Sequence, residues 1–484
     1  MYQWVFLIFI YLLGSLYINT LFPYLSRMDC QLLSPFFGVG FSSLAVGFLL
    51  ILSIPLSLLR LFILLIIIIY ITRLTFKKTS YYVLPWSKIL SGILSNVFSF
   101  TFVLYALISG LAVIVAFGYA SPDSTQFEGA GRYLAQGGLA QKTTTQIAFM
   151  LNGRLLIVGA MHAINRLFNG YSLYALNPTL SIWFIIFLAF KYFYLLRNME
   201  KFTRIILVLF FVITLALYKH VFNGMFHIHS SQLAMIFFTI SIISLYLFSI
   251  GEEKIWIYIG SLAISFACLT RVDMLLCSLI FFFLLILISR TNLQTMKYSW
   301  CIFFMTLLPW RVFTYYYTPW SKWYVSGEQL SLLIGANILL CGLTFVLLKY
   351  NRAYMQVYRI SPFILGPIII LIAGLLSPDK IQLGFNLFIL YILLGHGSWL
   401  LFTISFIFSV ISFIYVYRED MNYYILFTPI TFYLLLLFLL VSFAGYEGKD
   451  HSADRMVFHI VPLFIFSLFF SLSIFINKTI KLFR

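Results

Sequence analysis

The sequence predicts an all-α, polytopic membrane protein. Of its 484 residues, 62% are hydrophobic and only 9% are charged, whereas a soluble globular domain carries about 25% charged residues. The mean hydropathy is +1.02. Apolar runs long enough to cross a hydrocarbon core of ~30 Å recur along the whole chain, and they are continuously apolar, unlike the alternating strands of outer-membrane barrels. No segment between them is long enough for a separate soluble domain, so residues 1–484 are predicted to form one membrane domain.

The N-terminal part, residues 1–91, is predicted to contain three helices before the rest of the membrane domain. The expected spans are 4–22, 36–54 and 56–74, and Pro55 breaks the second apolar run from the third. Residues 4–22 lack a charged leading region and a small-residue cleavage site, so they are interpreted as a retained helix. The basic linker that follows, 75–91, is placed in the cytoplasm.

The next span, 93–118, leads into one of the few acidic stretches of the chain. Residues 121–146 are too polar to cross a bilayer, yet their apolar residues have helical spacing, which indicates a short amphipathic helix lying on the membrane surface. Asp123 follows the end of the apolar run by four residues. We expect 121–146 to be a catalytic external loop with Asp123 as its catalytic carboxylate.

Further apolar runs follow, and roughly fourteen crossings of the bilayer are expected in all. The run 147–168 carries Arg154, His162 and Arg166, which are costly against lipid and are therefore expected to face a cavity or another helix. The count is least defined at 36–74 and at 385–417, which forms one long span or two. The later runs are 178–196, 205–218, 232–250, 255–270, 274–289, 299–313, 330–348, 361–376, 385–417, 422–445 and 458–476.

The net charge of +17 does not indicate nucleic-acid binding, because Lys and Arg gather in short loops. This is the pattern of cytoplasmic loops in membrane proteins. The five cysteines have no C-x-x-C spacing and read as small core residues, implying neither a disulfide framework nor a metal site.

Acidic, basic and aromatic residues are expected to meet on the external face. A carboxylate can take a proton from a hydroxyl, and Arg or His can neutralise a phosphate leaving group, so this set suits group transfer from a lipid phosphate. Besides Asp123, the proposed substrate-binding residues are Glu128, Arg132, Tyr133, Arg271, Asp273, Arg311, Lys322, Arg455 and His459.

Several of these residues also have a purely structural interpretation. Asp123 could be a helix N-cap after Pro122. Arg271 and Asp273 are more simply a structural ion pair closing a helical turn. Arg455 and His459 are four residues apart and share one helical face, which favours joint contact with a phosphate, although a membrane anchor is the alternative.

The order of these features resembles the GT-C class of polytopic glycosyltransferases over residues 92–476. The class pattern D-x-x-x-[YF]-x-x-x-A-x-x-L-x-x-G falls on Asp123, Phe127, Gly131, Leu134 and Gly137, with Gly131 replacing the small Ala. LTRVD (269–273) is similar to a T-R-P-[DE] turn with Val in place of Pro. PWRVFTYYYTPW (309–320) and DRMVFHIVPLF (454–464) are similar to later segments of the class.

This resemblance implies transfer of a sugar from a polyprenyl-phosphate donor to a glycan, lipid or protein acceptor at the external face of a bacterial inner membrane. Asp123 would be the base, and Arg455 and His459 would contact the donor phosphate. No cofactor is expected, since the lipid-linked sugar is the donor substrate. Whether the reaction requires a divalent metal is left open. Two alternatives remain, namely a polysaccharide polymerase or O-antigen ligase and a lipid-glycan flippase or transporter.

Overall fold

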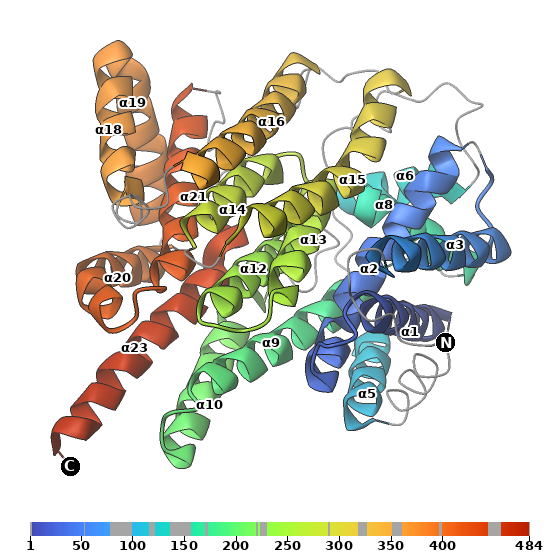
Figure 1. Ribbon diagram of the computed structural model, residues 1–484, viewed down its shortest axis with the longest axis horizontal. Helices are drawn as coiled ribbons and strands as arrows, with labels where there is room; N and C mark the ends of the chain where they lie inside the picture. Colours follow the sequence, from blue (N-terminus) through green and yellow to red (C-terminus); the bar gives the residue numbers. More distant parts are fainter. Residues whose placement is uncertain are drawn as a thin grey trace.

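The computed structural model is helical, without a β-strand, over the part of the chain that it describes (Figure 1). That part comprises residues 2–52, 54–77, 99–115, 122–135, 156–169, 173–218, 221–222, 230–288, 291–317, 327–350, 361–395, 399–443 and 456–483. The first helices are α1 (Tyr2–Leu21), α2 (Arg27–Ile51), α3 (Leu58–Lys77), α5 (Phe100–Val115), α6 (Pro122–Ala135), α8 (Leu156–Leu167), α9 (Leu176–Leu195) and α10 (Lys201–Leu217). The middle helices are α12 (Ser230–Ser249), α13 (Ile255–Thr270), α14 (Met274–Leu287), α15 (Leu293–Tyr317) and α16 (Gly327–Tyr350). The last are α18 (Ser361–Leu376), α19 (Pro378–Gly384), the π-helix η4 (Phe385–Gly395), α20 (Leu400–Glu419), α21 (Tyr424–Phe443), the 3₁₀ turn η6 (Phe458–Ile460) and α23 (Val461–Phe483).

Seven described helices are long and apolar enough to cross a membrane, which confirms the prediction of an all-α membrane protein. They are α1, α2, α9, α12, α20, α21 and the stretch Phe458–Ile480. Shorter apolar helices of 10–17 residues accompany them. The total of roughly fourteen spans stays a prediction.

Helix α12 lies at the centre of the bundle, and α20 lies at its edge. The apolar window of α12 is 100% buried, whereas only 28% of the corresponding window of α20 is buried. α12 packs along α13 and also contacts α9, α14 and α21. In a membrane, α12 is therefore surrounded by protein, and most of α20 faces lipid.

Helices α1 and α2 approach closely because small residues line their contact. Ser34, Gly38 and Ser42 recur every fourth residue on α2. A Cβ atom added to Gly38 would overlap the main-chain oxygen of Ile10, and one added to Gly14 would overlap that of Ser34. This small-residue spacing is the usual solution for close helix packing in lipid, where no hydrophobic effect drives helices together.

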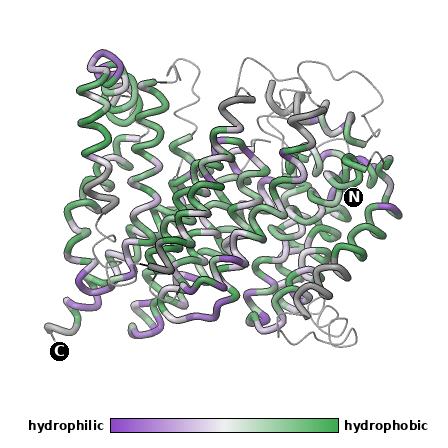
Figure 2. Tube along the Cα trace, turned by 45° about the horizontal axis from the view of Figure 1, so that its top comes forward, coloured by the Kyte–Doolittle hydropathy of each residue, from purple (hydrophilic) through white to green (hydrophobic). Residues whose placement is uncertain are grey.

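The carboxyl ends of α9, α12, α20 and α23 gather at one end of the bundle, which we call the basic end. Figure 2 shows hydrophilic residues collected along this edge, near the C-terminus. Lys478 pairs there with Glu419 at 2.7 Å, and Arg197 lies 3.7 Å from Glu252. Lys191, which is 3% exposed, forms a buried ion pair with Asp29 and so ties α9 to the start of α2.

Several predicted boundaries can now be compared with the helices. The break at Pro55 is confirmed, because α2 ends at Ile51 and α3 begins at Leu58. The run 385–417 forms two elements, η4 and α20. The predicted start of the second span at 36 was wrong, since α2 begins at Arg27, where the Ser26 side chain accepts a hydrogen bond from the Asp29 amide. The prediction that every cysteine is a core residue fails at Cys301, which is exposed.

Candidate functional site

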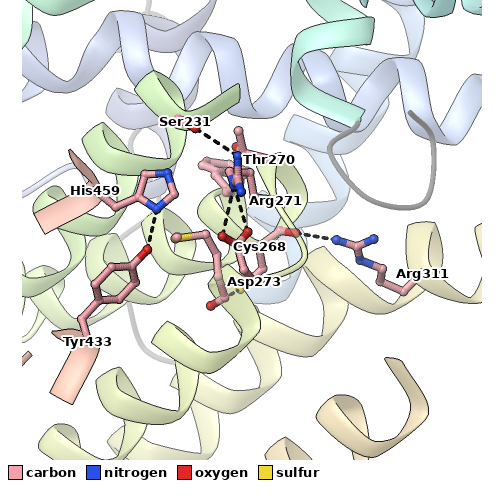
Figure 3. A network of polar contacts seen from close by, with 10 residues as sticks. Ser231, Cys268, Thr270, Arg271, Asp273, Arg311, Tyr433 and His459 are labelled. Carbon is pink, nitrogen blue, oxygen red and sulfur yellow. Dashed lines mark hydrogen bonds and ion pairs between the residues drawn. The ribbon is translucent and has the colours of Figure 1, made fainter. Parts of the chain in front are cut away.

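An ion pair occupies the turn between α13 and α14, at the end of α13 opposite the basic end. The Arg271 backbone is extended, with φ −149° and ψ 139°, so α13 ends there, and Asp273 directly precedes α14. Arg271 Nε donates to both carboxylate oxygens of Asp273, at 2.9 and 3.2 Å (Figure 3). The two side chains are 5% and 11% exposed. The prediction that these residues form an ion pair is confirmed.

Arg271 also connects the turn to α12. Its Nη1 donates to Ser231 Oγ at 3.0 Å, next to the first residue of α12. One guanidinium thus joins the beginning of α12 to the α13–α14 turn. A planar guanidinium with several donors is suited to such a double contact.

Arg311 approaches the same end of α13 from α15. Its Nη2 donates to the main-chain oxygen of Cys268 at 2.7 Å, and the side chain is 2% exposed. Cys268 lies in the last turn of α13, where carbonyl groups lack partners within the helix and carry the negative end of the helix dipole. A buried cation is stabilised by these carbonyls.

His459 comes from η6, immediately before α23, and contacts α21. Its Nδ1 lies 2.6 Å from the Tyr433 hydroxyl, and the imidazole is fully buried. In Figure 3 His459 and Tyr433 lie on one side of Asp273, and Arg311 lies on the other. We refer to Arg271, Asp273, Arg311, Tyr433 and His459 as the polar cluster.

The basic groups of the polar cluster control the ionisation of its carboxyl. Burial disfavours the charged form of Asp273, but the neighbouring charges of Arg271 and His459 outweigh burial, so the pKa of Asp273 lies below its ordinary value. Asp273 is therefore a carboxylate at neutral pH. The cluster contains two guanidinium groups, one imidazole and one carboxylate. Basic groups therefore outnumber acidic groups at this place in the apolar bundle.

A second group of charges joins α6 to α8. Glu128 Oε1 accepts hydrogen bonds from Arg132 Nη2 at 2.7 Å and from Arg166 Nη2 at 3.3 Å. His162 is 3% exposed, and its Cβ lies where a side chain on Gly131 would have to fit. The prediction that His162 and Arg166 face another helix is confirmed. We call Glu128, Arg132, His162 and Arg166 the Glu128 cluster.

Glu128 is also held in its charged form. Partial burial opposes ionisation, but hydrogen bonds and charge from Arg132, followed by His162 and Arg166, prevail, and the pKa of Glu128 lies below its ordinary value. α6 packs on α8, and α8 in turn contacts α13. The Glu128 cluster is thus one helix away from the helix whose end carries the polar cluster.

The predicted residues divide among three places. Arg271, Asp273, Arg311 and His459 meet around the end of α13, while Glu128 and Arg132 belong to the other cluster. Three lie beyond what the structure defines: Lys322 and Arg455 are outside the described residues, and so is Arg154.

Asp123 is the second residue of α6, and Tyr133 lies near the end of that helix. The predicted helix within 121–146 is confirmed over Pro122–Ala135, and the rest of that loop is outside the described residues.

The sequence did not predict two residues of this site, namely Tyr433 of the polar cluster and Ser231, which binds Arg271. Tyr433 is embedded in the apolar run of α21, and Ser231 is one of several serines in α12. Neither residue type is unusual in a membrane helix, so no sequence pattern marks these two positions. Within the described residues, no three His, Cys, Asp or Glu side chains gather as a metal ion would need.

Comparison of the chain with protein-family models, with curated proteins and with solved structures found no match.

Proposed function

We propose that this protein is a membrane glycosyltransferase that moves a sugar from a polyprenyl-phosphate donor to a hydroxyl group of a glycan, lipid or protein acceptor. The polar cluster would bind the donor phosphate, and α6 would supply the catalytic carboxylate. We place this chemistry on the face opposite the basic end. By the positive-inside rule the basic end is cytoplasmic, so the opposite face would be the external side of a bacterial inner membrane.

The observation that carries the proposal is the burial of basic groups at one end of an apolar bundle. Arg271, Arg311 and His459 are 5%, 2% and 0% exposed. Ionisable groups within membrane helices are costly to bury, and they commonly mark a substrate path or a binding site. A phosphate monoester or diester is one of the anions that arginine binds through two parallel hydrogen bonds.

The reaction needs a base on one side of the sugar and cations on the other. The acceptor oxygen attacks the anomeric carbon while its proton passes to a carboxylate, for which we propose Asp123. The bond between the anomeric carbon and the phosphate oxygen breaks, and its electron pair leaves with the lipid phosphate. Arg271, Arg311 and His459 would stabilise the negative charge that develops on this leaving group.

The Glu128 cluster supports the proposed place of the base. Glu128 binds Arg132 on its own helix and Arg166 on α8, which fixes α6 against the bundle. A base has to be held within hydrogen-bonding reach of the acceptor. Asp123 lies five residues before Glu128 on the same helix, so anchoring α6 would restrict its position.

The test is sugar transfer by the purified protein in liposomes, using radiolabelled polyprenyl-phosphate sugars and extracted cell-envelope acceptors. Asp123→Asn should reduce transfer by about 10²–10⁴-fold, the usual contribution of a general base, with unchanged folding. Glu419→Gln, at the basic end, is the matched carboxylate control and should retain full activity. Full transfer by folded Asp123→Asn protein would remove the assigned base, and no transfer by the wild type from any polyprenyl-phosphate sugar would refute the proposal.

A lipid-glycan transporter is the second candidate, favoured by one observation. The segment Phe385–Gly395 is an eleven-residue π-helix, and Pro309, Pro367 and Pro429 lie inside helices. Interrupted helices are common in transporters. Movement of a lipid-linked glycan between leaflets, without a new covalent product, would favour this function over the transferase.

A further inference from the structure

An apolar groove lies at the edge of the bundle, between α18, α19, η4, α20 and α21. Its volume is about 600 Å³. Aromatic rings dominate its wall, among them Phe388 from η4, Phe402 and Phe406 from α20, and Phe432 and Phe438 from α21. We call this cavity the phenylalanine groove.

Among the described residues, the walls of the phenylalanine groove offer no charged group and no spare hydroxyl donor. None of the described lining residues is charged. Its two threonines both donate to carbonyl oxygens nearby: Thr403 to Leu393 at 3.0 Å, and Thr431 to Thr428 at 2.9 Å. A polar ligand would lose its hydrogen bonds to water here without replacement. The groove therefore suits a hydrocarbon.

The groove is continuous with the lipid-facing surface of the protein. Its wall α20 exposes Leu401 at 72% and Ile407 at 53%, and its wall α18 exposes Leu371 at 63%. These side chains belong to the apolar surface that a bilayer covers. The groove is therefore accessible to a hydrocarbon chain of the bilayer.

Helix α21 connects the phenylalanine groove to the polar cluster. Phe432 and Leu434 line the groove, whereas Tyr433, between them, contacts His459 at 2.6 Å. Neighbouring residues of a helix point about 100° apart, so this single turn faces the hydrocarbon groove on one side and the buried imidazole on the other. A molecule with an anionic head and a long hydrocarbon chain matches both surfaces.

We propose that the phenylalanine groove binds the hydrocarbon chain of the lipid phosphate whose head group occupies the polar cluster. This assignment rests on the proposed function for the identity of the head group. It predicts that obstructing the groove weakens binding of the lipid without altering any charged residue.

Two glycines of α18 provide a matched pair of variants. A Cβ atom on Gly366, which lines the groove, would meet Leu435 Cδ2 of α21 at 3.6 Å, an ordinary contact distance. A Cβ atom on Gly374 would meet nothing within 4 Å. Gly366→Trp therefore fills the groove, whereas Gly374→Trp adds the same side chain outside it.

The experiment measures binding of a fluorescent polyprenyl monophosphate to the purified full-length protein. Gly366→Trp should weaken binding at least tenfold, while Gly374→Trp and Gly366→Ala should bind as the wild type does. Should Gly366→Trp fail to fold, Leu435→Trp obstructs the same groove from α21. Equal affinity of the folded obstructed variant and the wild type overturns the assignment.

Native mass spectrometry of the same proteins identifies the lipid that the groove holds. If Gly366→Trp loses a co-purified phospholipid while its polyprenyl-phosphate affinity is unchanged, the groove binds a bilayer lipid and the assignment is wrong. If the wild type itself does not bind polyprenyl monophosphate, the proposed function fails together with the assignment. If binding depends on the groove but no sugar is transferred, the assignment stands and only the proposed function fails.

Discussion

Replacement of Asp273 with asparagine removes the carboxylate that holds Arg271 at the end of α13. The pair has donor–acceptor distances of 2.9 and 3.2 Å, and its side chains are 5% and 11% exposed. Removal of one partner from a buried ion pair costs about 3–5 kcal/mol, because the other charge stays buried without compensation. Asparagine can still accept one hydrogen bond from Arg271, so we expect a loss near the lower end, about 3 kcal/mol.

A double-mutant cycle separates this pairing from general damage to the turn. Asp273→Asn leaves a buried cation, Arg271→Gln leaves a buried anion, and the double variant leaves neither. The double variant should therefore be more stable than the sum of the single losses predicts, by about 2 kcal/mol. Glu419→Gln, in the exposed pair with Lys478, is the control and should cause no resolvable change.

The assay is reversible unfolding in mixed detergent micelles, followed by tryptophan fluorescence. The pKa of Asp273 lies below its ordinary value in the folded protein, so its contribution is fully present above the ordinary carboxyl pKa of about 4. That contribution is lost as the pH falls through the lower folded-state pKa. The difference between wild type and Asp273→Asn should accordingly narrow in acid. The reasoning would be refuted if Asp273→Asn lowered the free energy of unfolding at neutral pH no more than Glu419→Gln does. It would also be refuted if the losses of the two single variants added up to that of the double variant.

Three further predictions concern packing, charge and exposure elsewhere in the bundle. Gly38→Leu should prevent α1 from packing on α2 and lower the folded yield in size-exclusion chromatography, whereas Gly342→Leu, with open space around it, should not. Lys191→Met should destabilise the protein by about 3–5 kcal/mol by leaving a buried carboxylate, and adding Asp29→Leu should restore much of that loss in the same unfolding assay. Cys301, which is exposed, should react with a lipophilic maleimide in the native protein, and labelling only after denaturation would contradict the described placement of α15.

Local patterns predicted the features that depend on neighbouring residues. The apolar runs predicted the helices, Pro55 predicted a break, and two opposite charges in one turn predicted the ion pair of Arg271 and Asp273. A charged side chain facing lipid is costly in free energy, which predicted that Arg166 faces a cavity or another helix. In the structure Arg166 pairs with Glu128 of α6. In each case the deciding energy arises within a few residues or from the bilayer itself.

Contacts between distant segments were not accessible in the same way. Arg311 binds the main-chain oxygen of Cys268. Every residue has such an oxygen, so no residue type identifies this acceptor in the sequence. Tyr433 lies 26 residues from His459 within an apolar run, so their contact depends on how α21 and η6 pack. The start of α2 was missed for a different reason. Ser26 and Asp29 form the N-cap of α2, but they precede the apolar run, so hydropathy does not mark the start of this helix.

Binding of the donor's phosphate by the polar cluster is the central claim, and a comparison of two lipids tests it most directly. Purified protein is titrated with a fluorescent polyprenyl monophosphate and with the same polyprenol lacking the phosphate. We expect the phosphate to strengthen binding at least tenfold in the wild type, and most of that gain to disappear in Arg311→Gln. Equal affinity for the two lipids, or an undiminished phosphate preference in both Arg311→Gln and Arg271→Gln, would contradict the account.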